Sequence, residues 1–341
     1  MLANFPSSCC SGSIVSLLAR VPMTRVRYNE GVSMDVVKAI KTFAKETVSK
    51  FYDLLSVDKR VPVADPTVEP WCAVCYIEST FEGGEIEHGS GFLISPKMVL
   101  TAAHNLCQLD KDGKRMGAHQ VLVRLGSPPG SKQKPAVAAR FVYDKRYADN
   151  LEQQWNSELS KTHSSEREMK AVELEDPSYY DYGAIFLDEE LTPKPGFVFK
   201  VRGTDPDDPG WDEPLTCAGY PADRNYQLCY ADGAAYPDQS GRFMGSNSHL
   251  VVHRVTAKEG QSGGPLYLRD SNGEFAVVGI HVRFNKGVKI AGSVKRTNGA
   301  VRITKGMQTL FQLWEEENRS ANSQLGKSKH DVDVDSPKFI A

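Results

Sequence analysis

The sequence predicts an all-β domain, a barrel or a sandwich, over residues 57–310 of a 341-residue chain. Short runs rich in β-branched and aromatic residues alternate there with Gly, Pro, Asn and Asp turns, and most of these runs have no helical pattern between them. The expected strands are Cys72–Ile77, Gly91–Ile94, Gln120–Leu125, Ala184–Leu187, His249–Val255, Phe275–Val282 and Ala300–Ile303. A chain of this length holds one large domain with extensions or two modest domains.

An amphipathic helix is expected over residues 33–56, before the β-rich domain. Ser33 is suited to cap its start, and apolar residues recur at helical spacing after it. The apolar face needs a partner surface. Residues 1–56 are therefore an N-terminal helical extension, either packed on the main domain or forming a pro-segment that is later removed.

Two later segments also depart from the β pattern. An insertion at about residues 145–175 contains the charged stretch Asp149–Val172, which is expected to form a surface helix. Gln308–Glu317 is expected to be the closing helix of a domain that spans residues 57–317. Residues 318–341 are polar and are expected to be a disordered tail.

Composition excludes several classes of function. A formal net charge of -2 gives no electrostatic basis for binding nucleic acid, and no apolar run approaches the length of a membrane span. The seven cysteines are odd in number and sparse, so no disulfide scaffold is implied. Cys72-Ala-Val-Cys75 lacks a second pair, and we expect no metal and no cofactor. Residues 1–22 match neither a secretory signal nor a transit peptide well, which leaves the compartment open.

Ser262 lies between glycines in Gly260-Gln-Ser-Gly-Gly-Pro265. Glycine adopts backbone conformations that other residues cannot, and it lets a second molecule come close. A nucleophilic serine needs both properties, because its hydroxyl must reach a carbonyl while nearby N–H groups point at the developing oxyanion. The alternative is an ordinary turn, since Gly, Ser and Pro interrupt many loops.

A base and an acid upstream would complete this chemistry. His104 ends Thr101-Ala-Ala-His104, and imidazole is the side chain best suited to accept a serine proton near neutral pH. Asp181 stands just before an apolar strand, where a buried carboxylate would fix the imidazole tautomer. Asp176 and Asp188 flank that segment in turn-like surroundings and are expected to be solvated.

Thr101–His104, Asp181–Ile185 and Gly260–Pro265 together resemble the catalytic blocks of chymotrypsin-clan (trypsin-like) serine proteases. Within that clan, the chain most resembles the bacterial glutamyl endopeptidases. The further blocks that carry this resemblance are Val57–Arg60, Val63–Thr67, Pro70-Trp71, Gly219–Arg224, Gly279–His281 and Asn298–Ile303. The resemblance covers about residues 57–315. It implies two six-stranded antiparallel β-barrels with a C-terminal helix, acting as a monomer on peptide or protein substrates.

The resemblance also implies a role for each residue of the site. Ser262 Oγ would attack the scissile carbonyl while His104 takes its proton, and Asp181 would orient the imidazole. The backbone N–H groups of Gly260 and Ser262 would form the oxyanion hole. His104 and Asp181 would come from one barrel and Ser262 from the other, with the active site in the crevice between them.

Substrate preference follows from further matching positions. In the glutamyl endopeptidases, the histidine of the Gly-Ile-His strand contacts the acidic side chain that precedes the cleaved bond, and His281 matches it. Arg283 lies two residues later, on the same face of a strand, and would add positive charge. The family's pocket threonine is replaced by Ala257, with Thr256 one position earlier. We expect cleavage after Glu or Asp; a packed strand histidine in a broader trypsin-like protease is the alternative.

Other features depart from the family pattern. Lys258 and Glu259 replace small residues before the serine, where Lys258 would attract and Glu259 would repel an acidic substrate. Many relatives carry a cysteine next to the catalytic histidine. Here the cysteine is displaced to Cys107, with no partner near Gly89, so we do not expect the family-type disulfide.

Processing and loss of activity are both open from the sequence. Relatives are commonly made as zymogens, and the boundary would fall near Leu55–Val61. Lys59-Arg60 is either a dibasic processing site or a charged turn. A protease-like binding protein without turnover is the alternative to an active enzyme, although all three catalytic residues are present.

Overall fold

The computed structural model describes residues 58–126, 134–163, 175–193, 196–205, 211, 213–235, 249–270, 272–290 and 293–325. The chain divides into two compact units, residues 1–57 and 58–341. The first unit, with the helix expected over residues 33–56, lies outside the described residues. Residues 326–341 lie outside them too.

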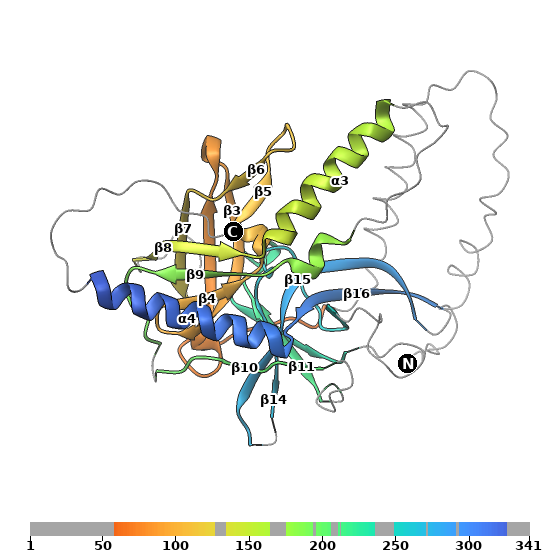
Figure 1. The fold of residues 1–341 in the computed structure, drawn as a ribbon. Coiled ribbons are helices and arrows are strands. Elements are labelled where there is room, and N and C mark those ends of the chain that lie inside the picture. The colour runs from red at the N-terminus through yellow and green to blue at the C-terminus, as the bar shows by residue number, and fades with distance from the viewer. Residues whose placement is uncertain are drawn as a thin grey trace, which may run out of the picture. The chain divides into compact units, whose positions relative to one another are not determined.

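Six antiparallel strands close into a barrel in the first part of the larger unit (Figure 1). In barrel order they are β2 (Val74–Thr80), β3 (Ile86–Ser95), β4 (Met98–Thr101), β9 (Gly183–Leu187), β8 (Ala136–Tyr143) and β7 (Gln120–Leu125). Inward-facing side chains such as Phe92, Leu100 and Ile185 are fully buried. Their burial supplies the apolar core that a small closed barrel needs.

The second part forms a larger sheet instead of the expected second closed barrel. Among the described residues, its order is β1 (Val61–Pro62), β12 (Cys229–Gly233), β11 (Leu215–Gly219), β14 (Pro265–Arg269), β15 (Phe275–Ile290), β16 (Ser293–Arg302) and β13 (Leu250–His253), with β10 (Lys200–Val201) pairing with β15. The β10 pairing is parallel, so this sheet is not wholly antiparallel. β12 and β13 approach each other at one bridge between Ala235 and His253. The path from β12 to β13 therefore nears closure without forming a full ladder.

The remaining elements are short or helical. The short ones are β5 (Cys107–Leu109), β6 (Arg115–Gly117) and the 3-10 helices η1 (Trp71–Ala73), η2 (Glu82–Gly84), η3 (Ala103–Asn105), η4 (Pro177–Tyr180) and η6 (Ala222–Arg224). The α-helices in the described ranges are α3 (Lys145–His163), in the charged insertion, and α4 (Lys305–Leu325). Neither is long and apolar enough to cross a membrane. Because α4 continues to Leu325, the expected disordered tail is wrong for residues 318–325.

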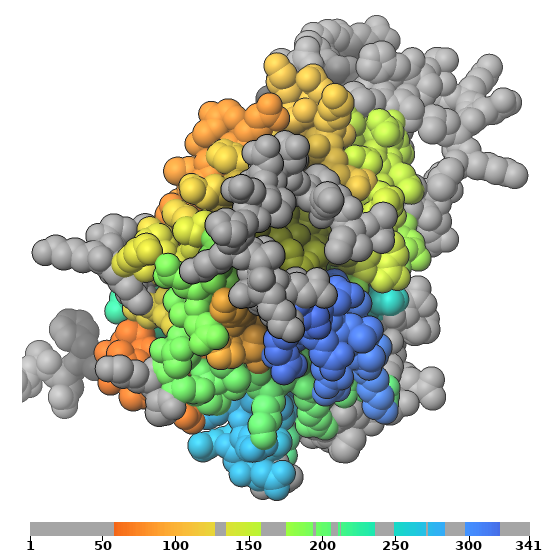
Figure 2. All heavy atoms as spheres, turned by 60° about the vertical axis from the view of Figure 1, so that its left-hand side comes forward, coloured from red at the N-terminus to blue at the C-terminus, as the bar shows by residue number. Residues whose placement is uncertain are grey.

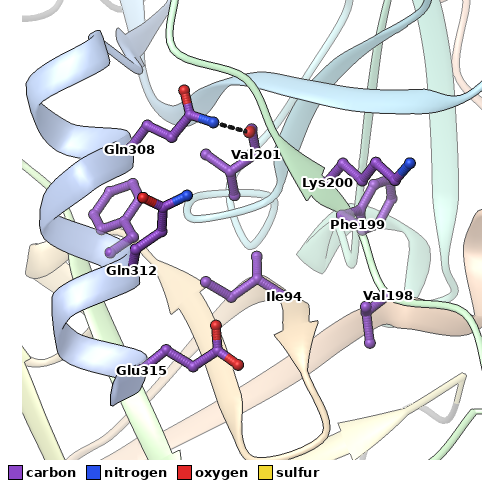
Figure 3. Close-up of a pocket in the computed structure, with 9 residues that line it drawn as sticks. Ile94, Val198, Phe199, Lys200, Val201, Gln308, Gln312 and Glu315 are labelled. Atoms are coloured by element: carbon purple, nitrogen blue, oxygen red, sulfur yellow. Dashed lines mark hydrogen bonds between the residues drawn. The ribbon is translucent and has the colours of Figure 1, made fainter. Parts of the chain in front are cut away.

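α4 packs against the body of the protein through Phe311, which is 1% exposed. On the surface it lies beside the segment that contains β10 (Figure 2). A groove of about 330 Å³ lies between this helix and residues 198–201, and Gln308 Nε2 spans it with a 3.0 Å hydrogen bond to the Val201 carbonyl (Figure 3). None of the expected site residues lines the groove.

Arg60 fixes the start of the described unit. Its side chain is 1% exposed, and its guanidinium lies 2.8 Å from Asp58 and 2.6 Å from Asp223. Arg224 adds a second contact to Asp58 at 2.9 Å. Hydrogen bonds to Arg60 lower the pKa of Asp223. A buried guanidinium requires such partners, so the cluster ties the β1 segment to η6.

Replacing Arg60 by methionine is expected to lower the free energy of unfolding by about 1–3 kcal/mol, because the carboxylates of Asp58 and Asp223 lose their donors. The exposed neighbour Lys59 offers a matched control. Lys59→Met is expected to change the free energy of unfolding by less than about 0.5 kcal/mol. Urea unfolding followed by tryptophan fluorescence measures both. Equal stabilities of the two variants would contradict the role of Arg60.

Candidate active site

His104 and Asp181 are 77 positions apart in sequence and lie side by side in the first barrel. η3 follows β4 and carries His104, whereas Asp181 ends η4 just before β9, the neighbour of β4. Asp181 Oδ2 lies 2.7 Å from His104 Nδ1, and Asp181 Oδ1 accepts the His104 backbone N–H at 2.9 Å. The carboxylate therefore fixes both the ring and the backbone of the histidine.

The surroundings of His104 raise its pKa. Burial acts to lower the pKa, but the charge and hydrogen bond of Asp181, together with the charge of Glu87, outweigh burial and raise it above the ordinary value for histidine. Asp181 is itself only 4% exposed. The imidazole keeps 31% of its surface exposed. A carboxylate on Nδ1 leaves Nε2 as the proton acceptor.

Ser262 lies on a loop that requires glycine at two positions. Gly260 has a φ of +88° and Gly263 a φ of +85°, which side chains rarely adopt. Space imposes the same requirement, because a Cβ at Gly260 would overlap the Tyr220 carbonyl and one at Gly263 would overlap the Ser90 carbonyl. The glycines around the serine are thus explained by torsion and by close approach.

The peptide groups that precede Gly260 and Ser262 are each held in one orientation. The Glu259 carbonyl accepts the first N–H of η6 at 2.9 Å, and the Gln261 carbonyl accepts the Gly264 N–H at 3.0 Å. In a planar trans peptide the C=O and N–H point in opposite directions. The N–H groups of Gly260 and Ser262 therefore point away from those partners, and neither donates to an acceptor in the described parts of the chain. Two unpaired, oriented donors are what an oxyanion hole requires.

Ser90 and Asn105, which the sequence analysis did not single out, bind the serine loop by hydrogen bonds. The Ser90 N–H and Asn105 Nδ2 donate to the Ser262 carbonyl at 2.8 and 3.0 Å, and Ser90 Oγ donates to the Gly260 carbonyl at 2.7 Å. Nothing in the sequence around Ser90 and Asn105 indicates that these polar residues contact the serine loop. Within the described residues, no hydrogen bond joins Ser262 Oγ to His104; such contacts are often long in the absence of substrate.

His281 lies directly beside the serine loop. Its N–H donates to the Gly264 carbonyl at 2.9 Å and its carbonyl accepts the Gly263 N–H at 2.6 Å. The ring is 3% exposed. Burial, with a smaller effect from a positive charge on His104, lowers the pKa of His281 to about 4. Its imidazole is therefore neutral near pH 7.

A second histidine lies behind it. The ring of His253 is fully buried, 5.6 Å from that of His281 between centroids and inclined at 67°. Among the residues that the structure describes, both His253 ring nitrogens and His281 Nδ1 lack hydrogen-bond partners, as do Thr297 Oγ1 and Asn298 Oδ1 on the adjacent β16. The sequence indicated only packing for His253. The structure places this second buried imidazole next to that of His281.

The other expected substrate-binding residues are placed differently. Thr256 is half-buried, three residues after β13. Arg283 donates to the Asp176 carboxylate and the Ser178 hydroxyl, so its charge is compensated within the protein. Asp176 was expected to be solvated; it is the N-cap of η4 and accepts the Ser178 N–H at 3.0 Å. An aspartate followed by a proline is a recognisable N-cap signal.

Comparison with known proteins identifies the family. Residues 89–280, more than half of the chain, match the trypsin-like peptidase domain. The chain belongs to the trypsin-like peptidase family. The matched range of this peptidase contains His104, Asp181 and Ser262.

Several solved structures are similar to this trypsin-like peptidase. A Glu endopeptidase in complex with MPD is 19% identical with a TM-score of 0.51, and the alignment covers 76% of this chain and 98% of that one. The thermostable serine protease AL20 from an extremophilic microorganism is 17% identical, with a TM-score of 0.46 over 70% and 94% of the two chains. Protease Anisep from Arthrobacter nicotinovorans is 16% identical, with a TM-score of 0.45 over 70% and 93%. No curated protein matches the chain.

The His104 pKa gives a test that needs no activity. We expect the pKa of the imidazole in Ser262→Ala protein to lie above the ordinary value for histidine, and Asp181→Asn in that background to lower it, since the favourable charge is lost. Asp188→Asn, an exposed carboxylate at the end of β9, is the control and leaves the pKa unchanged. NMR titration of the ring protons measures it. A pKa insensitive to Asp181→Asn would contradict the pairing.

Proposed function

We propose that this trypsin-like peptidase is an active serine endopeptidase that uses His104, Asp181 and Ser262. The observation that carries the proposal is the pairing of His104 with Asp181 beside a loop whose Gly260 and Ser262 amides are oriented and have no acceptor among the described residues. A base held by a buried carboxylate and two free donors next to a serine are the parts that acyl transfer requires.

In the proposed reaction, Ser262 Oγ bonds to the scissile carbonyl carbon as its proton passes to His104 Nε2. The carbonyl oxygen becomes negative and accepts hydrogen bonds from Gly260 and Ser262. When the C–N bond breaks, His104 gives its proton to the leaving amine. Water then repeats the sequence and releases the acyl group from Ser262. Asp181 keeps its hydrogen bond to Nδ1 throughout and stabilises the imidazolium.

A fluorophosphonate probe tests the nucleophile. The wild-type protein is expected to be labelled at Ser262, and Ser262→Ala and His104→Ala are expected to lose at least about 99% of the labelling rate, because removing a triad residue costs several orders of magnitude. Ser95→Ala, at the far end of β3, is the matched control. Intact mass spectrometry follows the adduct. Unlabelled folded wild type would support the alternative, a protease-like binding protein without turnover.

We further propose a preference for an acidic residue before the cleaved bond, with His281 as its main contact and Thr256 beside it. The support is the position of His281, whose backbone is bonded to Gly263 and Gly264 next to the nucleophile. Arg283 contributes little direct charge, because Asp176 already binds it. The charge of Lys258 helps to lower the pKa of Asp223.

This preference predicts a pH-dependent selectivity. His281 is neutral above its pKa of about 4, and a bound carboxylate favours the imidazolium, so binding takes up a proton and KM rises as the pH increases. For the wild-type protein, matched peptides with Glu or Gln before the cleaved bond are expected to differ at least about tenfold in kcat/KM at pH 6.5 and by a smaller factor at pH 8.5. In His281→Ala, the two peptides are expected to have the same kcat/KM. The exposed histidine variant His119→Ala is the control. If His281→Ala leaves the ratio of kcat/KM for the Glu and Gln peptides unchanged, the proposed preference for an acidic residue is wrong.

A further inference from the structure

Asn105, the residue after His104, spans the space between the first barrel and the nucleophile loop. Its side chain is buried, with the residue 4% exposed. Nδ2 donates to the Ser262 carbonyl at 3.0 Å and to Thr101 Oγ1 at 2.9 Å. The Ser90 N–H donates to the same Ser262 carbonyl. The carbonyl of the nucleophile therefore receives two hydrogen bonds, and both come from the barrel that carries the base.

Two glycines, one on each side, make room for this asparagine. A Cβ at Gly89 of β3 would lie 2.5 Å from Asn105 Cγ, and one at Gly263 would lie 2.8 Å from Asn105 Nδ2. Neither position accepts a side chain without displacing the amide. The amide thus fills a space that is shaped for it and bonded on both sides, which distinguishes it from a side chain that merely occupies the interior.

η3 connects all three members of the proposed triad over two consecutive residues. The His104 N–H and Nδ1 are bonded to Asp181, and the next side chain is bonded to Ser262. Since His104 and Ser262 belong to different sheets, a shift of this turn changes the distance between base and nucleophile. A misplacement of about 1 Å can cost about 100-fold in rate.

We propose that Asn105 is a positioning residue that holds Ser262 within reach of His104 through hydrogen bonds alone. This inference rests on the proposed serine-protease function. The five cysteines in the described ranges are all free. The connection between the two halves of the site is accordingly insensitive to thiol reductants, and the Asn105 amide is the side chain of η3 that contributes to it.

Replacement of Asn105 tests the inference. Asn105→Ala and the equally sized Asn105→Asp are expected to lower kcat and the fluorophosphonate labelling rate at least about tenfold, with KM changed by less than about twofold. The matched control is Asn318→Ala, which removes a similarly buried asparagine in α4 and leaves kcat unchanged. Wild-type rates in Asn105→Ala, or an equal loss in Asn318→Ala, overturn the inference.

A covalent replacement separates positioning from general destabilisation. In Gly89→Cys/Asn105→Cys, the 2.5 Å from the Gly89 Cβ position to Asn105 Cγ is close enough for a disulfide. The oxidised double variant is expected to recover at least half of the wild-type labelling rate and to lose this recovery on reduction. Asn105→Cys alone is expected to be labelled slowly with or without reductant, and the labelling rate of the wild type is expected to be unchanged by the reductant. A slow variant with a disulfide confirmed by mass spectrometry, or a reductant-sensitive wild type, overturns the inference. Wild type that is never labelled overturns the proposed function as well.

Discussion

The proposed base and nucleophile belong to different sheets, so their relative position depends on contacts that cross from one sheet to the other. Ser90 and Asn105 supply these contacts by donating to the Gly260 and Ser262 carbonyls. These contacts also orient N–H groups of the same loop. A peptide group is planar, so a hydrogen bond that fixes its carbonyl fixes the direction of its N–H as well. The glycines of the loop follow from this constraint, since any side chain at Gly263 would push the barrel away.

The two histidines near the serine illustrate how neighbours decide protonation when burial acts alike on both. Desolvation lowers the pKa of His104 and of His281. His104 has a carboxylate at 2.7 Å, which reverses the shift, whereas a charge on His104 would lower the pKa of His281 further. Under the proposed function, His104 would hold a proton during catalysis and His281 would gain one when an anionic substrate binds.

The sequence predicted the family, the positions of seven of the sixteen strands in the described residues and the pairing of His104 with Asp181, because these depend on local patterns and on compact motifs. It did not predict the partners of Arg283 or the role of Asn105. Those contacts join residues 107 and 157 positions apart, and no periodicity records such a meeting. The open second sheet was missed for a related reason: whether β12 and β13 close depends on twist summed over the strands between them.

The buried Arg60 cluster limits where the N-terminal unit can be cut away. A processing protease must draw several residues around the cleaved bond into its own cleft in an extended form, with the side chain before the bond inserted in a pocket. The Arg60 side chain is 1% exposed and bonded to two carboxylates, one of them in η6. The Lys59-Arg60 pair is therefore a poor substrate once β1 has joined β12. A cut at the basic pair therefore requires that this segment first leaves its carboxylate partners.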